Sequence, residues 1–161
     1  MVTPPANPEG ERLPRAPRLE LRSEMLAKLR AQAAAAYPEE ACGALLGRKR
    51  QSDSIVVKDL VAVPNARDSE RTRRYLIGPE HVVGLERAAG ALGLDVVGYY
   101  HSHPDAAAVP SEFDRDHAWP FYIYVIVGVR SGDAAKVRAW RLLEDRRGFE
   151  PVLIVDEDEI D

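Results

Sequence analysis

Cysteine, long apolar runs and an excess of one charge are all scarce in this sequence of 161 residues. Its single cysteine, Cys42, excludes a disulfide within the chain and fits a reducing compartment. No stretch is long and apolar enough for a membrane span, and the N-terminal residues lack the apolar core of a signal peptide. The net charge of −4 gives no electrostatic signature of nucleic-acid binding. We therefore expect a cytoplasmic protein without a membrane or nucleic-acid partner.

Length and composition predict one folded domain between two polar ends. Residues 1–17 contain five prolines and no apolar cluster, which predicts a disordered leader. Residues 156–161 carry five acidic side chains and form an acidic tail. The folded domain is expected over residues 18–155, a length that can bury a core of its own.

The apolar pattern along the chain predicts an α+β domain, in which helices flank a mixed, mostly antiparallel, curved sheet. Helices are expected over 19–36 (or a shorter helix capped by Ser23), 79–92 and 111–118. Strands are expected over 43–47, 54–64, 73–77, 95–103, 122–129, 136–143 and 149–155.

The most informative stretch has the pattern H-x-H-x7-S-x2-D, formed by His101, His103, Ser111 and Asp114. The preceding residues 95–101 are apolar, β-branched and aromatic, which is typical of a buried strand. Residues two apart in a strand face the same side, so the two histidines should lie close enough to share a metal ion. Histidine and aspartate are zinc ligands, and catalytic zinc sites commonly have three protein ligands and one open position.

Ser111 and Asp114 allow two interpretations. They lie on one face of a predicted helix, so Asp114 can complete a ligand set while the Ser111 hydroxyl lies near the reacting water. Ser-x-x-Asp also resembles a helix N-terminal capping box, although such boxes usually close with Glu or Gln. One serine can serve both roles, so the spacing does not choose between them.

A hydrolytic zinc site also needs a carboxylate that acts as a general base without binding the metal. The pair Glu39 and Glu40 stands immediately before the small, apolar run 41–47. This position suits a carboxylate at the end of a helix or strand, over a pocket. The alternative is two solvated glutamates at a helix–strand junction, which describes most such pairs.

Four arginines lie between residues 67 and 74, with Asp68 and Glu70 among them. Most runs of this kind are solvated loops. The other interpretation is a contact surface for an acidic partner.

Taken together, these segments resemble the JAMM (MPN+) zinc metalloprotease family, in its compact prokaryotic form. The resemblance rests on residues 40–47, on residues 98–104 and on Ser111-x-x-Asp114, and it covers about residues 19–155. Family members cleave peptide or isopeptide bonds at the C-terminus of ubiquitin-like proteins. The fold that the resemblance implies is the cytidine-deaminase-like JAMM/MPN fold.

The resemblance implies a role for each of five residues. His101, His103 and Asp114 would bind one zinc ion per chain. Glu40, the second glutamate of its pair, would act as general base toward metal-activated water and then protonate the leaving amine. Ser111 would stabilise the tetrahedral intermediate. The implied partner is a ubiquitin-like or sulfur-carrier protein ending in Gly-Gly; bond type and homodimer formation stay open.

Two other classes of function compete with this one. The first is a zinc-bearing MPN scaffold that binds a ubiquitin-like partner without turnover, and the intact Glu40 argues against it. The second is a zinc deaminase, which uses a His-x-Glu element and a Pro-Cys-x-x-Cys element. The sequence contains neither element.

Overall fold

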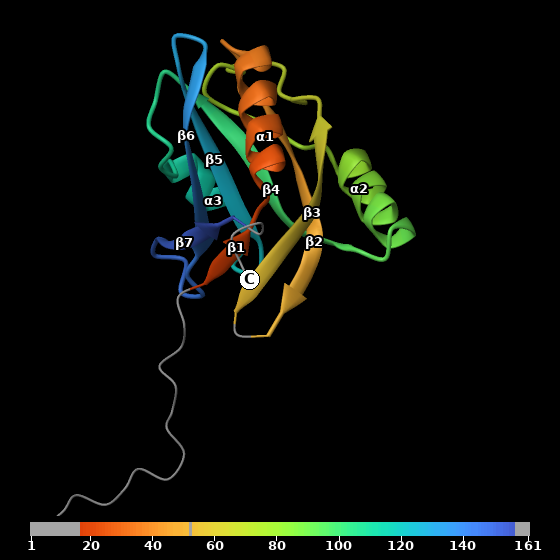
Figure 1. The fold of residues 1–161 in the computed structure, drawn as a ribbon. Coiled ribbons are helices and arrows are strands. Elements are labelled where there is room, and N and C mark those ends of the chain that lie inside the picture. Colours follow the sequence, from red (N-terminus) through yellow and green to blue (C-terminus); the bar gives the residue numbers. More distant parts are fainter. Residues whose placement is uncertain (1–16, 52, 157–161) are drawn as a thin grey trace, which may run out of the picture.

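The computed structural model describes residues 17–51 and 53–156 (Figure 1). The predicted leader and acidic tail therefore lie outside the described residues, apart from Pro17 and Asp156. The helices are α1 (Ser23–Ala36), α2 (Pro79–Ala91) and α3 (Glu112–His117). The strands are β1 (Arg18–Glu20), β2 (Cys42–Arg50), β3 (Ser54–Val63), β4 (Asp95–Pro104), β5 (Ile123–Arg130), β6 (Asp133–Leu142) and β7 (Phe149–Val155).

Within the described residues the strands form one closed sheet, in the order β1-β3-β2-β4-β5-β6-β7. The sheet closes because β1 pairs with both β3 and β7. These two pairings and that of β4 with β5 are parallel, and the other four are antiparallel. The α+β class and the mixed, mostly antiparallel pairing are confirmed, but the expected curved sheet is corrected to a closed barrel.

Strand β1, which closes the barrel, was not predicted from the sequence, because its residues resemble the start of a helix. Residues 19–36 were expected as one helix, whereas the helix begins at Ser23, as the shorter alternative proposed. Leu19 and Leu21 are fully buried, and the intervening Glu20 faces the other way, toward the Ser54 hydroxyl. This period-two pattern is that of a strand, but three residues are too few for periodicity to reveal it.

The predicted strand over residues 73–77 is also wrong. This segment joins no sheet, and the side chain of Asn65 meets part of its backbone hydrogen-bonding need. The Asn65 amide nitrogen donates to the Arg74 carbonyl at 2.9 Å, and its oxygen accepts from the Leu76 amide at 3.1 Å. A side chain has thus replaced a neighbouring strand as the partner.

Strand β4 is buried on both faces. On one face Tyr100 packs into the cluster that includes Leu29 and Ala33 of α1. On the other face Val96 packs with Leu85 and Ala89 of α2. Helices therefore cover both sides of the strand that carries the two histidines (Figure 1). None of the described helices has the length and apolar character required to cross a membrane.

Candidate metal centre

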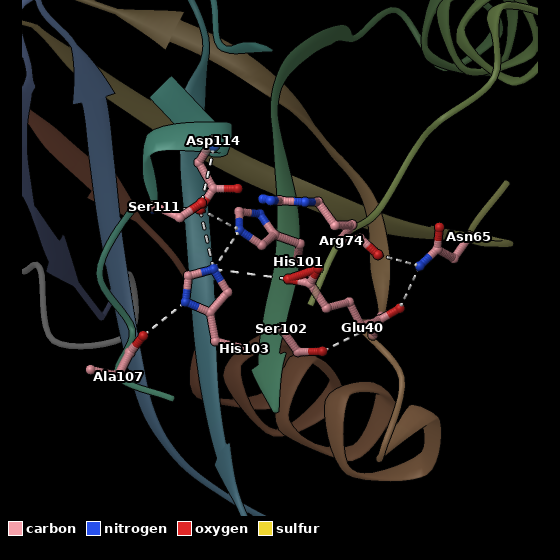
Figure 2. A network of polar contacts seen from close by, with 10 residues as sticks. Glu40, Asn65, Arg74, His101, Ser102, His103, Ala107, Ser111 and Asp114 are labelled. Carbon is pink, nitrogen blue, oxygen red and sulfur yellow. Dashed lines mark hydrogen bonds and ion pairs between the residues drawn. The ribbon is translucent and has the colours of Figure 1, made fainter. Parts of the chain in front are cut away.

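The carboxyl end of β4 brings His101 and His103 to one point. His101 lies opposite Cys42 of β2 and Ile126 of β5, so neighbours on both sides fix its backbone. Its side chain is 1% exposed. The chain then turns through residues 105–110, and the first turn of α3 returns Asp114 to the two imidazole rings (Figure 2).

Three side-chain atoms form a nearly equilateral triangle at this point. His101 Nε2 lies 3.1 Å from His103 Nε2, and Asp114 Oδ2 lies 3.3 Å and 3.2 Å from these two nitrogens. Ligands about 2.0 to 2.1 Å from a tetrahedral ion stand about 3.3 Å apart, so the triangle has the size that zinc requires. The three residues therefore fit a tetrahedral metal ion.

The hydrogen bond of His103 supports the same conclusion. Its Nδ1 lies 2.8 Å from the carbonyl oxygen of Ala107, which can only accept, so Nδ1 carries a proton. In the neutral ring, Nε2 then carries no proton, and its lone pair points at the Asp114 carboxylate oxygen. A cation relieves that repulsion, and a backbone carbonyl on the other nitrogen is the usual orienting partner of a metal-binding histidine.

Asp114 is positioned by the start of α3. Its Oδ2 accepts from the backbone N–H of Ser111 at 2.9 Å, and its own N–H donates to Ser111 Oγ at 3.1 Å. The capping box and the proposed ligand position therefore use the same two residues, and both interpretations of the motif hold geometrically. Burial alone would raise the pKa of Asp114, but the hydrogen bonds that His101 and His103 donate when their facing nitrogens are protonated outweigh it and lower the pKa well below the ordinary value.

Glu40 is a second carboxylate beside the triangle. Its Oε1 lies 3.9 Å from His103 Nε2, longer than the edges made by Asp114. Both histidines and Glu40 offer ligand atoms within 4.8 Å of one another, so distance alone would also admit Glu40 as a ligand. The shorter edges favour Asp114, which leaves the Glu40 carboxylate next to the ion position.

Burial determines the chemistry of Glu40. The residue is 3% exposed, and its Oε2 has no hydrogen-bond partner among the described residues. Desolvation, only partly offset by His103, raises its pKa to about 8. A carboxyl group with this pKa can accept and release a proton near neutral pH.

The Ser111 hydroxyl faces the same cavity as Glu40. A cavity of about 390 Å³ is lined by both residues and by His103, together with small side chains such as Ala106 and Ala107. Because Ser111 Oγ accepts from the Asp114 amide, its own O–H remains free to donate.

Two supporting residues were not identified from the sequence. Tyr75 stacks on the His101 ring with centroids 4.5 Å apart. Ser102 Oγ accepts from the Ala41 N–H at 2.7 Å, which ties β4 to the residue after Glu40. Ser102 lies inside the histidine motif and could have been singled out. Tyr75 lies 26 positions from His101, and no signal in the sequence links them.

Cys42 has no part in this chemistry. Its thiol is buried and donates to the Val63 carbonyl oxygen at 3.5 Å. Burial raises the pKa of the Cys42 thiol to about 12, so it is neither a thiolate ligand nor a nucleophile at neutral pH.

Comparison with known proteins gives consistent matches. The family model described as prokaryotic homologs of the JAB domain matches residues 22–143. A desampylase from Haloferax volcanii is 40% identical over 106 residues, which cover 65% of this chain and 73% of that protein. A probable TtuB-protein conjugate cleaving protease from Thermus thermophilus is 31% identical over 110 residues, covering 66% and 70% of the two chains.

Two solved structures match most of the chain. The solution structure of a protein from Salinibacter ruber is 40% identical, with a TM-score of 0.69, and covers 89% of this chain and 93% of that one. A JAB1/MPN domain protein from Archaeoglobus fulgidus is 22% identical, with a TM-score of 0.52, and covers 86% and 99%. At that identity, the second match shows the fold alone.

Proposed function

Because the chain belongs to the family of prokaryotic homologs of the JAB domain, we propose that it hydrolyses the bond between the C-terminus of a ubiquitin-like protein and a second chain. At the coarser level the chain is a peptidase or isopeptidase. The finer proposal names the ion as zinc, assigns five residues to the reaction and specifies a Gly-Gly terminus on the substrate.

One observation supports this proposal most strongly. Three potential ligand atoms, from His101, His103 and Asp114, lie at the mutual distances expected around a zinc ion. The buried carboxylate of Glu40, whose Oε2 has no hydrogen-bond partner among the described residues, lies beside them. We propose that His101, His103 and Asp114 hold the ion and that Glu40 does not. When bound, zinc would polarise the scissile carbonyl and acidify water, as it does in other metallopeptidases.

Glu40 moves the protons in the proposed reaction. Water loses one proton to the Glu40 carboxylate as its oxygen bonds to the carbonyl carbon. Glu40 then delivers that proton to the nitrogen of the leaving amine as the C–N bond breaks. The raised pKa suits this exchange, because the group must take up a proton and release it within one turnover. Bound zinc would draw the pKa back down toward neutrality.

Ser111 stabilises the negative charge that develops on the carbonyl oxygen. Its hydroxyl proton is free to donate, and its oxygen is held by the Asp114 amide, so the donor is positioned before substrate arrives. A single donor of this kind can contribute about 3 to 4 kcal/mol to transition-state stabilisation.

We infer that the substrate ends in Gly-Gly, as in ubiquitin-like modifiers and sulfur carriers. Glycine has no side chain, so its backbone can approach the ion position closely in a cavity that Ala106 and Ala107 help to line. A reducing cytoplasmic compartment fits the free thiol of Cys42.

The test pairs metal content with cleavage. Wild type and Glu40→Gln are purified, zinc per chain is measured, and both are incubated with ubiquitin-like proteins extended beyond Gly-Gly. We expect about one zinc in each and cleavage by wild type alone. Zinc in both without cleavage of any extension would favour a scaffold that binds a ubiquitin-like partner without turnover. Absence of zinc from both would refute the proposed site.

A further inference from the structure

The guanidinium of Arg74 lies over the ring of Phe113, with Cζ 4.2 Å from the ring centroid. Phe113 immediately precedes Asp114 on α3, whereas Arg74 belongs to the irregular segment after β3. The contact therefore joins the segment after β3 to the helix that carries Asp114. In Figure 2 the Arg74 side chain extends from its segment toward His101 and Asp114.

The donors of Arg74 are not used within the described part of the chain. Its nearest charged partner there is Glu70 Oε2, 3.9 Å from Nε, which is too far for a hydrogen bond. The neighbouring Arg73, in contrast, makes a short ion pair with Glu70 and is 70% exposed. The Arg74 side chain is only 29% exposed, and its guanidinium has no hydrogen-bond acceptor among the described residues.

The two residues of this contact line different cavities. One is the cavity of about 390 Å³ that contains Glu40 and Ser111, and Arg74 lines it. The other, of about 370 Å³, is lined by Phe113 and Asp114, with apolar and aromatic side chains such as Tyr122 and Trp119. Each cavity also contains one or more of the residues around the ion position, so the Arg74–Phe113 contact lies where an extended chain could run from one cavity to the other.

We propose that Arg74 is a substrate-binding residue, whose guanidinium binds the backbone carbonyl next to the scissile bond and then the carboxylate that cleavage creates. The inference rests on the proposed function. Hydrolysis adds water across the amide bond, so the amine leaves with a proton and the last glycine becomes a carboxylate. A guanidinium is the side chain best matched to a carboxylate, because it offers two parallel donors.

The location of Arg74 agrees with this role. Asp114 and, when ionised, Glu40 offset the positive charge of the ion, so a further positive charge beside them would favour a product carboxylate. Arg74 acts electrostatically on Glu40, which places its positive charge near that carboxylate. Stacking on Phe113 fixes the plane of the guanidinium and removes part of the entropy cost of binding.

The experiment compares two peptides ending in Ala-Ala-Gly-Gly, one with a free carboxylate and one with a C-terminal amide. Binding to the zinc-loaded protein is measured by calorimetry for wild type, Arg74→Gln, Arg74→Lys and Arg73→Gln. We expect wild type to bind the carboxylate roughly tenfold or more tightly than the amide. Arg74→Gln should lose most of this preference, Arg74→Lys should keep part of it, and Arg73→Gln should keep all of it.

Arg73→Gln is the matched control, because it removes the same charge from a neighbour that lines the same cavity. Zinc content and melting temperature are recorded for each variant, so that a purely structural role of Arg74 would be detected. A carboxylate preference in Arg74→Gln equal to that of wild type would overturn the inference. So would millimolar or weaker binding of both peptides by wild type, or equal losses in Arg74→Gln and Arg73→Gln.

Hydrolysis is measured separately, with an extended ubiquitin-like protein as substrate. If the inference is correct, KM in Arg74→Gln should rise roughly tenfold or more, and kcat should change less. An Arg74-dependent carboxylate preference without hydrolysis by wild type would refute the proposed function and support the carboxylate site.

Discussion

Ser111 and Asp114 exchange two hydrogen bonds, of 2.9 and 3.1 Å, and the carboxylate oxygen that takes part also faces both histidines. The start of α3 and the proposed ligand set therefore form one structure. A change at either residue should affect helix stability and metal chemistry together, and suitable substitutions can separate the two effects.

Substitutions at Ser111 should distinguish its role in capping α3 from its proposed role as a hydrogen-bond donor in catalysis. Ser111→Ala should lower kcat by about 10² to 10³, because a donor to the oxyanion is lost, and should cost about 1 kcal/mol of stability. Ser111→Asp restores a capping oxygen but has no proton to donate when ionised, so stability should recover and kcat should not. Steady-state kinetics and urea unfolding would measure the two effects. Recovery of kcat in Ser111→Asp would contradict the proposed role.

Glu40→Gln should keep the metal and lose turnover. The amide preserves the size of the side chain but cannot accept a proton, so kcat should fall by about 10² to 10⁴. The adjacent Glu39→Gln serves as control and should be nearly unchanged, because Glu39 is exposed. Full activity in Glu40→Gln would show that another group is the base.

Asp114→Asn should weaken metal binding. The amide oxygen is a poor ligand for zinc, and one negative charge is lost. Zinc affinity should therefore fall by at least about a hundred-fold, which is more than the loss typical when a residue that only orients a ligand is replaced. Competition with a chromogenic chelator would measure the affinity. Asp116→Asn, on the exposed side of the same helix, is the control. If Asp114→Asn bound zinc as tightly as wild type, Glu40 would become the better candidate for the third ligand.

Without metal, Glu40 should destabilise the protein as pH rises. The folded state raises the pKa of Glu40 from 4.5 to about 8, so folding favours its protonated form. Stability that is complete below pH 4.5 should therefore be lost progressively up to about pH 8, by an amount on the order of 4 to 5 kcal/mol. In chelator, Glu40→Gln should match wild type near pH 4.5 and be more stable at pH 8. Parallel stability curves for the two proteins would rule out this effect.

Gly98 should tolerate no side chain. A Cβ at this position would lie 2.0 Å from the Ile123 carbonyl oxygen, so Gly98→Ala must separate β4 from β5, three residues before His101. We expect a loss of about 3 kcal/mol or more, by analogy with overpacked cores, together with weaker zinc binding. Gly84→Ala is the control, because its Cβ would meet nothing within 4 Å and should stabilise α2 by about 0.5 to 1 kcal/mol. Urea unfolding of both variants would test the contrast.

Local patterns predicted most of the elements and the geometry of the candidate site. The buried run before His101 identified β4, and the two-residue period correctly brought His101 and His103 to one side. Ser111 and Asp114 lie close in sequence, so helical spacing could place them. The proximity of Glu40 to this group, however, came from resemblance to a family, because no local rule relates Glu40 to His103, which are 63 positions apart.

Barrel closure and the environment of the site depend on long-range contacts, which local patterns do not encode. Strand β1 is defined by partners at Ser54 and Leu153, not by its own three residues. The segment containing Arg74 looked like a strand because of Tyr75 and Ile77, yet Asn65 holds part of its backbone. Both errors come from hydrogen-bond partners that are distant or are side chains.

The parallel pairing of β1 with β7 also determines where the two ends of the described chain emerge. Leu19 lies beside Ile154 and Ile55, near the hairpin between β2 and β3, whereas His101 pairs with Cys42 at the far end of β2. The described chain therefore enters β1 at the pole of the barrel away from the histidines, and it leaves β7 beside Glu20, two residues further along this pair of strands. An attachment that precedes β1 therefore starts at the pole opposite the histidines.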